Sequence, residues 1–168
     1  MLFKNVGEYQ DIQYRNVISR YYTVSPEEMP DTYNAFLEEV RKAGYTLRGP
    51  FFYTINSKLE ENQDVLMELF IPVEEEYIED TLPEDFLYHS LFQVLNTVST
   101  RILEPDDESV KEGISFLAGY IYYQGHCELT PPFFFTTISD GKVYTDIKVG
   151  VLKETFSGIQ SIEEIFGW

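Results

Sequence analysis

The side chains of this sequence best placed to do chemistry are two carboxylates, Glu68 and Asp146, in segments with the alternating pattern of strands. In the segment 65–73 every odd-numbered residue is apolar, which predicts a core-facing side and puts Glu68 on the opposite side. The same parity puts Asp146 on the equivalent side of a strand over 143–152. A carboxylate among aromatic rings suits an organic cation, because each ring adds roughly 0.5–2 kcal/mol of cation–π attraction.

Aromatic residues near these acids complete the predicted site. The candidate ligand-binding residues are Glu68, Asp146, Tyr53, Phe135, Tyr144, Phe70, Tyr22 and Tyr123. In the alternative interpretation the two acids lie on a solvated sheet face, where Lys148 pairs with one of them at little energetic gain. The aromatic rings then pack in the core, or anchor a protein partner.

Motifs of catalysis are absent from the sequence, which contains no GxGxxG, Walker, GxSxG or HExxH pattern. The two histidines, His89 and His126, are far apart, and His126 with its neighbour Cys127 does not form a zinc-binding pattern. We therefore expect no cofactor, no metal site and no catalytic nucleophile. A hydrolase that uses Glu68 or Asp146 as an acid–base group ranks below a binding module.

Composition limits the partners of the chain. The 168 residues fit one domain, and 43% hydrophobic residues are enough for a core. Asp and Glu number 29 against 12 Lys and Arg, and the formal net charge of −17 argues against nucleic acid and an anionic membrane surface. One cysteine and no signal-peptide pattern favour a cytoplasmic protein. We expect a small-molecule ligand or a basic protein partner, in an oligomeric state left open.

Two stretches of the chain resemble each other in order and spacing. The hexapeptide GPFFYT at 49–54 matches PPFFFT at 131–136. Val17 aligns with Val98 before the hexapeptides, and the strand segment 65–73 aligns with 143–151 after them. Because the order is kept and the spacing between matched positions hardly changes, we predict an internal repeat, with coincidence between two aromatic-rich stretches as the alternative.

Each half has the pattern strand, helix, strand, strand. The first helix is predicted to begin at the S-x-x-E pattern of 25–28 and to end at Gly44, and the second to begin in the acidic stretch 104–108 and to end at Gly125. The expected strands cover 15–24, 49–56, 65–73, 92–103, 133–139 and 143–152, with a tight turn at 140–141 and a last helical turn at 161–166.

Two such halves pair most economically edge to edge. The predicted fold is α+β: duplicated βαββ halves form a mostly antiparallel sheet with two helices on one face and a central groove on the other. The expected organisation is a single domain over 1–168, with repeat one at about 14–73, a linker at 74–85, repeat two at about 86–152 and a tail at 153–168.

The order of a strand, an S-P-E-E helix start, a helix ending at Gly44, G-P-F-F-Y and a strand with E-x-x-I-P-V resembles the GyrI-like, AraC-type effector-binding domain. The resemblance covers roughly 14–152 and implies a duplicated βαββ fold whose groove binds small molecules, often cationic and aromatic, over a buried acid. It implies the stand-alone form, since no helix-turn-helix pattern precedes it. In drug-binding members the key acid is a late-strand glutamate, where this sequence has Asp146. Gly150 stands where the first half has Pro72.

The chain also resembles, more faintly, accessory proteins encoded beside LXG-type toxins in Gram-positive type VII secretion loci. That resemblance rests on size, acidity and general pattern, and it implies an adaptor or chaperone that binds another protein. The leading hypothesis from the sequence is a non-enzymatic module that binds a small cationic or aromatic ligand in the groove between the halves.

Overall fold

The computed structural model of the chain describes residues 6–57 and 63–152, so the predicted helical turn at 161–166 lies outside the described residues. The elements in chain order are β1 (Val6–Val24), the 3-10 turn η1 (Pro26–Glu28), α1 (Met29–Lys42), β2 (Phe52–Ile55), β3 (Val65–Pro72), β4 (Leu87–Leu103), α2 (Asp107–Tyr123), β5 (Cys127–Glu128), β6 (Phe133–Ser139) and β7 (Lys142–Leu152).

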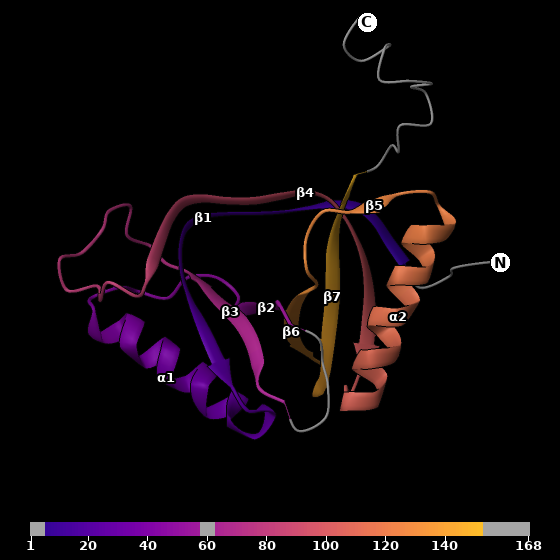
Figure 1. Ribbon diagram of the computed structural model, residues 1–168. Helices are drawn as coiled ribbons and strands as arrows, with labels where there is room; N and C mark the ends of the chain where they lie inside the picture. Colours follow the sequence, from indigo (N-terminus) through magenta and orange to yellow (C-terminus); the bar gives the residue numbers. More distant parts are fainter. Residues whose placement is uncertain (1–5, 58–62, 153–168) are drawn as a thin grey trace, which may run out of the picture.

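Six strands close into a ring. Their order is β4-β1-β3-β2-β6-β7, the β4–β7 pairing closes the ring, and β5 extends it beside β7. Every pairing is antiparallel, so the predicted α+β class with a mostly antiparallel sheet and two helices is confirmed. The closure depends on β1 and β4, which have 19 and 17 residues and pair with a different strand at each end (Figure 1).

The strand register relates the two halves symmetrically. In the β1–β4 ladder Gly7 pairs with Ser99 while Ser19 pairs with Leu87, so Ser19 and Ser99 occupy equivalent positions, as do Gly7 and Leu87. In the β2–β6 ladder Tyr53 and Phe134 pair at the centre and are therefore equivalent to each other.

The hexapeptide alignment is shifted by one residue relative to the β2–β6 strand register. It aligns Tyr53 with Phe135, whereas the β2–β6 ladder makes Phe134 the equivalent of Tyr53. A slip of one residue reverses every side chain of a strand. Residues matched by the hexapeptide alignment therefore point to opposite faces of the sheet.

Two asparagines interrupt the alternation of the long strands. Asn16 in β1 and Asn96 in β4 both have a φ of 57°, in the left-handed region that asparagine tolerates better than most residues. Tyr14 and Val17 flank Asn16 with opposite parity, yet both belong to the same inner cluster. The inner side of β1 therefore changes from one parity to the other at Asn16.

The predicted helix-capping residues have different outcomes at the ends of the two helices. Ser25 makes no side-chain cap, and a 3-10 turn separates it from α1, so the predicted capping role of Ser25 is wrong. At α2 the side chain of Asp106 accepts from the backbone N–H of Ser109, whose hydroxyl accepts in return from the N–H of Asp106. Gly44 and Gly125, with φ of 101° and 71°, end their helices as predicted.

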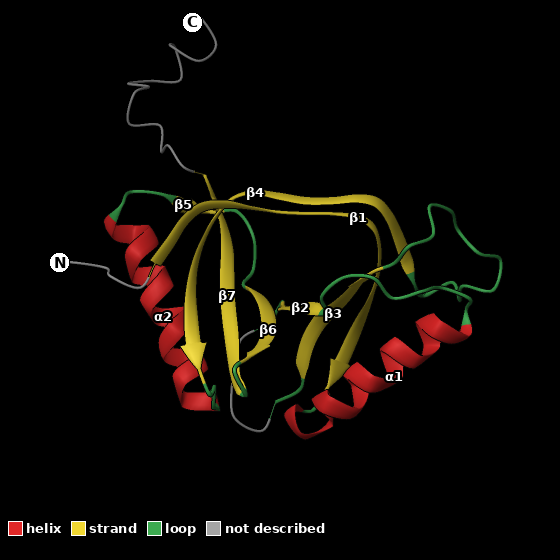
Figure 2. Ribbon diagram, turned by 180° about the vertical axis from the view of Figure 1, so that it is seen from behind, coloured by secondary structure: helices red, strands yellow, loops and turns green. Residues whose placement is uncertain are grey.

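Buried side chains form three clusters. The helices cover the outside of the ring at its two ends, each over its own cluster (Figure 2). Phe36 and Val40 of α1 pack on the odd-numbered residues of β3, and Leu117 and Ile121 of α2 pack on β7. The third cluster fills the inside of the ring and consists of Ile12, Val17, Phe52, Phe70, Phe133 and Phe135, with Tyr14, Phe92 and Val94 packed against it.

Candidate functional site

Glu68 lies in the middle of β3, opposite Tyr21 of β1 and Thr54 of β2. Its side of the strand is that of Phe70, which faces the inside of the ring, and the side chain is only 8% exposed. The Oε2 atom accepts a hydrogen bond of 2.8 Å from Ser19 Oγ. In the described part of the chain no lysine or arginine pairs with Glu68, so this nearly buried carboxylate has no neutralising cation there.

Ser19 connects Glu68 to a histidine of β4. The Ser19 hydroxyl gives its single proton to Glu68, so its oxygen accepts from Nε2–H of His89 at 2.9 Å. Burial lowers the pKa of His89, and the nearby Glu68 charge acts in the opposite direction. Ser19 itself is fully buried. The result is a hydrogen-bonded row from β3 through β1 to β4 that fixes the position of the carboxylate.

Exposed apolar groups stand around this carboxylate. Tyr21 is 50% exposed, and a hydrogen bond to Glu68 is the main cause that raises the pKa of Tyr21, with burial and the carboxylate charge adding to it. Leu66 and Leu87 lie on the same side and are 38% and 45% exposed. Thr54 Oγ1 is buried beside them and lacks a hydrogen-bond partner in the described structure. The site thus combines one acid, one phenol and an apolar rim.

Stacked rings form the floor next to Glu68. The ring of Phe52 lies between those of Phe70 and Phe135, with centroids 4.8 and 4.7 Å apart and interplanar angles of 3° and 15°. Phe92 and Phe133 close the cluster, 5.7 and 6.2 Å from Phe52. These rings occupy the centre of the predicted groove, so a ligand of Glu68 would lie on them and not between the halves.

Asp146 has a different environment from Glu68, although both lie on the inner side of equivalent strands. Arg101 of β4 binds it through two hydrogen bonds, Nε to Oδ1 at 2.7 Å and Nη2 to Oδ2 at 3.0 Å. The hydrogen bonds and charge of Asp146 raise the pKa of Arg101. Because both carboxylate oxygens are engaged by a guanidinium, Asp146 offers little negative charge to a cationic ligand.

The structure brings part of the predicted set to the inner side of the ring. Phe70 belongs to the Glu68 site, and Phe135 lies in the shared floor, paired with Asp146. The Arg101 guanidinium carbon lies 5.4 Å from the Tyr144 ring centroid, so Tyr144 belongs to the Asp146 side.

The other three predicted residues lie outside the ring. The Tyr22 ring packs edge-on against Phe36 of α1. Tyr53 stacks on Tyr33 of α1 and on Phe134, with centroids 5.1 and 5.0 Å apart. Tyr123 lies on the exposed side of α2 and is 61% exposed. The one-residue slip of the hexapeptide alignment explains Tyr53, which was predicted as the counterpart of Phe135.

Sequence reasoning missed Ser19, Tyr21, His89 and Arg101. The parity of β1 relative to β3 would have found Ser19 and Tyr21, since the odd-numbered residues after Asn16 face inward. No sequence pattern assigns a role to His89. It lies before the predicted start of its strand at residue 92, and β4 in fact begins at Leu87.

The sequence predicts no metal site at His126 and Cys127. The Nε2 atom of His126 lies 3.1 Å from the hydroxyl of Tyr9, while Cys127 is exposed. Across residues 6–57 and 63–152, no three His, Cys, Asp or Glu side chains gather as a metal ion would require.

A pH effect on folding follows from His89. Its lowered pKa means that the unfolded chain binds a proton more readily, so this contribution to stability is present above the unfolded value of about 6.5 and is lost as pH falls below it. We expect the unfolding free energy of wild type to fall more steeply below that pH than that of His89→Gln, whose amide still donates to Ser19. Urea unfolding at several pH values measures the difference, and parallel pH curves would contradict the assignment.

Comparison with solved structures identifies the fold. The chain is similar to the EcmrR C-terminal domain (17% identity, TM-score 0.69), with 87% of this chain and 99% of that chain covered. It is similar to EcmrR in an EcmrR–DNA complex (16%, TM-score 0.72), where 89% of this chain matches 58% of that one. A hydrolase from Listeria innocua is similar at 13% identity and TM-score 0.54, with 86% and 91% covered. At these identities the likeness shows a shared fold.

The chain folds as an α+β barrel that is similar in fold to the EcmrR C-terminal domain. In this chain a nearly buried acid, Glu68, lies on the inner side of the barrel. The chain belongs to the family described as Domain of unknown function (DUF5085), which matches residues 13–153. Comparison with curated proteins gives no match. Within the described ranges, neither helix has the length and apolar character needed to cross a bilayer.

Proposed function

We propose that this chain is a non-enzymatic binding module of the GyrI-like type, and that it holds a small aromatic cation at Glu68. The observation that carries the proposal is a carboxylate that is 8% exposed, stands beside stacked rings and has no lysine or arginine partner among the described residues. A nearly buried carboxylate is costly unless it is compensated, and a bound cation would supply that compensation.

The surroundings of Glu68 support an aromatic ligand over a metal ion. The exposed ring of Tyr21 and the apolar rim of Leu66 and Leu87 offer contact area to a flat organic molecule. Apolar walls with few convergent polar groups are typical of small-molecule sites.

A hydrolytic role is less well supported by the same residues. Ser19 lies within hydrogen-bond distance of His89, as a nucleophile and base would, but it is fully buried and its proton is given to Glu68. A nucleophile needs access to the reacting carbon and a base that takes its proton. The net charge of −17 supports partners other than nucleic acid. We also propose the cytoplasm as the compartment of this protein.

We expect the substitution Glu68→Gln to weaken binding of thioflavin T, a fluorescent aromatic cation, by about tenfold or more. Glutamine keeps the size of the side chain and an oxygen that accepts from Ser19, but it removes the charge, and a tenfold change corresponds to about 1.4 kcal/mol. A fluorescence titration of the folded variants gives both dissociation constants.

Two matched substitutions test whether position matters. Glu74→Gln removes an exposed charge just beyond β3 and should leave the affinity unchanged. Asp146→Asn should have a smaller effect than Glu68→Gln, because Arg101 already neutralises Asp146. The proposal fails if wild type shows no saturable binding of the probe, or if all three variants bind it equally.

A further inference from the structure

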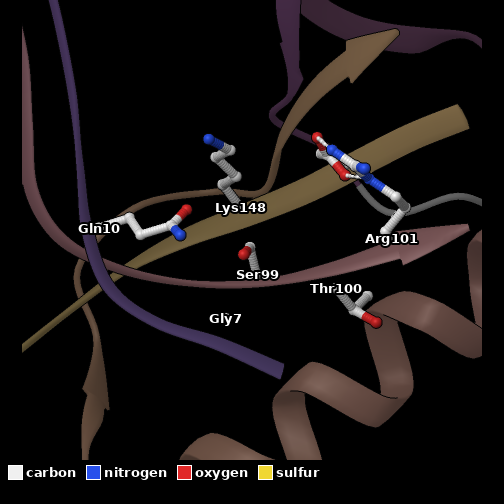
Figure 3. A pocket seen from close by; sticks show the side chains of 7 residues that line it. Gly7, Gln10, Ser99, Thr100, Arg101 and Lys148 are labelled. Carbon is white, nitrogen blue, oxygen red and sulfur yellow. Dashed lines mark hydrogen bonds and ion pairs between the residues drawn. The ribbon is translucent and has the colours of Figure 1, made fainter. Parts of the chain in front are cut away.

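A cavity with a positive net charge, opposite in sign to Glu68, lies on the second half of the ring. It has a volume of about 270 Å³ and is lined by Gly7, Gln10, Ser99, Thr100, Arg101, Asp146 and Lys148 (Figure 3). We propose that this cavity, named here the Lys148 pocket, binds a small organic monoanion through its carboxylate group. The site is separate from Glu68, and the inference does not depend on the cation proposed there.

Lys148 supplies the charge that an anion would meet. In the described structure its ammonium group pairs with no carboxylate, and Nζ lies 5.0 Å from the Phe135 ring centroid. Ser99 pairs with Lys148 in the β4–β7 ladder, so their side chains share one face of the sheet, and Figure 3 shows the Gln10 side chain extending toward them from β1. An ammonium, an amide N–H and a hydroxyl are all hydrogen-bond donors for a carboxylate.

The Arg101–Asp146 pair sets the net charge of the pocket. Two cations and one carboxylate line it, and both oxygens of the carboxylate are taken by Arg101. The pocket therefore carries a charge of about +1 in a protein whose net charge is −17. One uncompensated positive charge matches a monoanion.

Comparison of the two halves explains why the pocket is open here. Gly7 stands at the position that Leu87 occupies beside Glu68. A Cβ atom on Gly7 would lie 2.6 Å from Ser99 Oγ, so any side chain there would displace the hydroxyl that faces the pocket. Lys148 likewise stands where the first half has Phe70. The second half therefore replaces two apolar groups by open space and an amine.

The test uses benzoate as the anionic probe and benzamide as its neutral analogue, with the folded chain in low salt, because salt screens exposed charges. We expect benzoate to bind with a dissociation constant of about 1 mM or tighter and to shift the backbone amide resonances of Gly7 and Ser99. Benzamide should bind at least about tenfold more weakly.

Substitutions assign the binding to Lys148. Lys148→Gln should weaken benzoate about tenfold, while Lys142→Gln, an exposed lysine of the same strand, should leave it unchanged. Asp146→Asn should tighten benzoate, because it leaves the Arg101 guanidinium without its counter-charge. Glu68→Gln should leave benzoate binding unchanged, which separates this inference from the proposed function.

The inference is overturned if benzoate binds no better than benzamide, or if Lys148→Gln and Lys142→Gln behave alike. Inorganic phosphate serves as a third probe. Tighter binding of phosphate than of benzoate would contradict the preference for a monoanion. Thermal unfolding of each variant, followed by circular dichroism, confirms that the compared chains are folded.

Discussion

The substitution Phe52→Ala is expected to lower the free energy of unfolding by about 3–5 kcal/mol. Phe52 is fully buried, and its ring lies between those of Phe70 and Phe135 at the centre of the inner cluster. Removing it deletes stacked contacts on both faces and leaves a cavity enclosed by strands that cannot collapse without breaking the ring. Urea unfolding of both proteins, analysed with the same dependence of the unfolding free energy on urea concentration, gives the difference in unfolding free energy.

Tyr122→Ala is the matched control for this loss. Tyr122 is 88% exposed on α2, so removal of its ring should change the unfolding free energy by about 0.5 kcal/mol or less. Equal denaturation midpoints for the two variants would show that the inner cluster is not packed as described. A large loss at Phe52 alone would confirm that the aromatic floor of the candidate site is also the centre of the fold.

The substitution Gly113→Leu should destabilise the chain by about 1–3 kcal/mol through overpacking. Gly113 is the point where α2 approaches the sheet, and a Cβ atom there would lie 2.8 Å from Ile102 Cδ1 and 3.0 Å from Ile147 Cδ1. Ile147 is fully buried, so a side chain at Gly113 requires these isoleucine side chains to repack or α2 to move outward. A lowered melting temperature with retained helical circular dichroism is the expected signature.

Gly119 provides the comparison in the same helix. A Cβ atom at Gly119 meets nothing within 4 Å, so Gly119→Leu adds helix propensity of roughly 0.5–1 kcal/mol without a clash. The two substitutions should therefore change stability in opposite directions. A stabilising effect at both positions would mean that α2 does not approach the sheet at Gly113.

Local sequence signals predicted most of the elements and the inner-side position of both Glu68 and Asp146. The alternation of 65–73 placed Met67 and Leu69 against α1 and Glu68 on the opposite side, as the structure has them. Positive-φ glycines ended both helices, and the tight turn at 140–141 has φ of 53° and 74° at its two residues. These features succeed because they depend on residues close together in the sequence.

The partners of Glu68 could not be predicted in the same way. Ser19 and His89 reach it from strands that begin far away in the sequence, and the side of β1 on which Ser19 lies is set after the left-handed residue Asn16. The neutralisation of Asp146 by Arg101 depends on the β4–β7 pairing that closes the ring. Parity within one strand carries no information about which strand becomes its neighbour.

Closure of the ring also determines which strand edges the protein offers to its own copies. Each of the six ring strands pairs with two neighbouring strands, and β5, the strand added beside β7, has only two residues. The pairing is one-sided along residues 6–16 of β1, which pair only with β4, and along residues 87–96 of β4, which pair only with β1. Unpaired strand edges are templates on which other chains add strands and begin to aggregate. Among the described residues, closure therefore covers the strand edges where the ring is complete, and open edges remain along these one-sided stretches of β1 and β4.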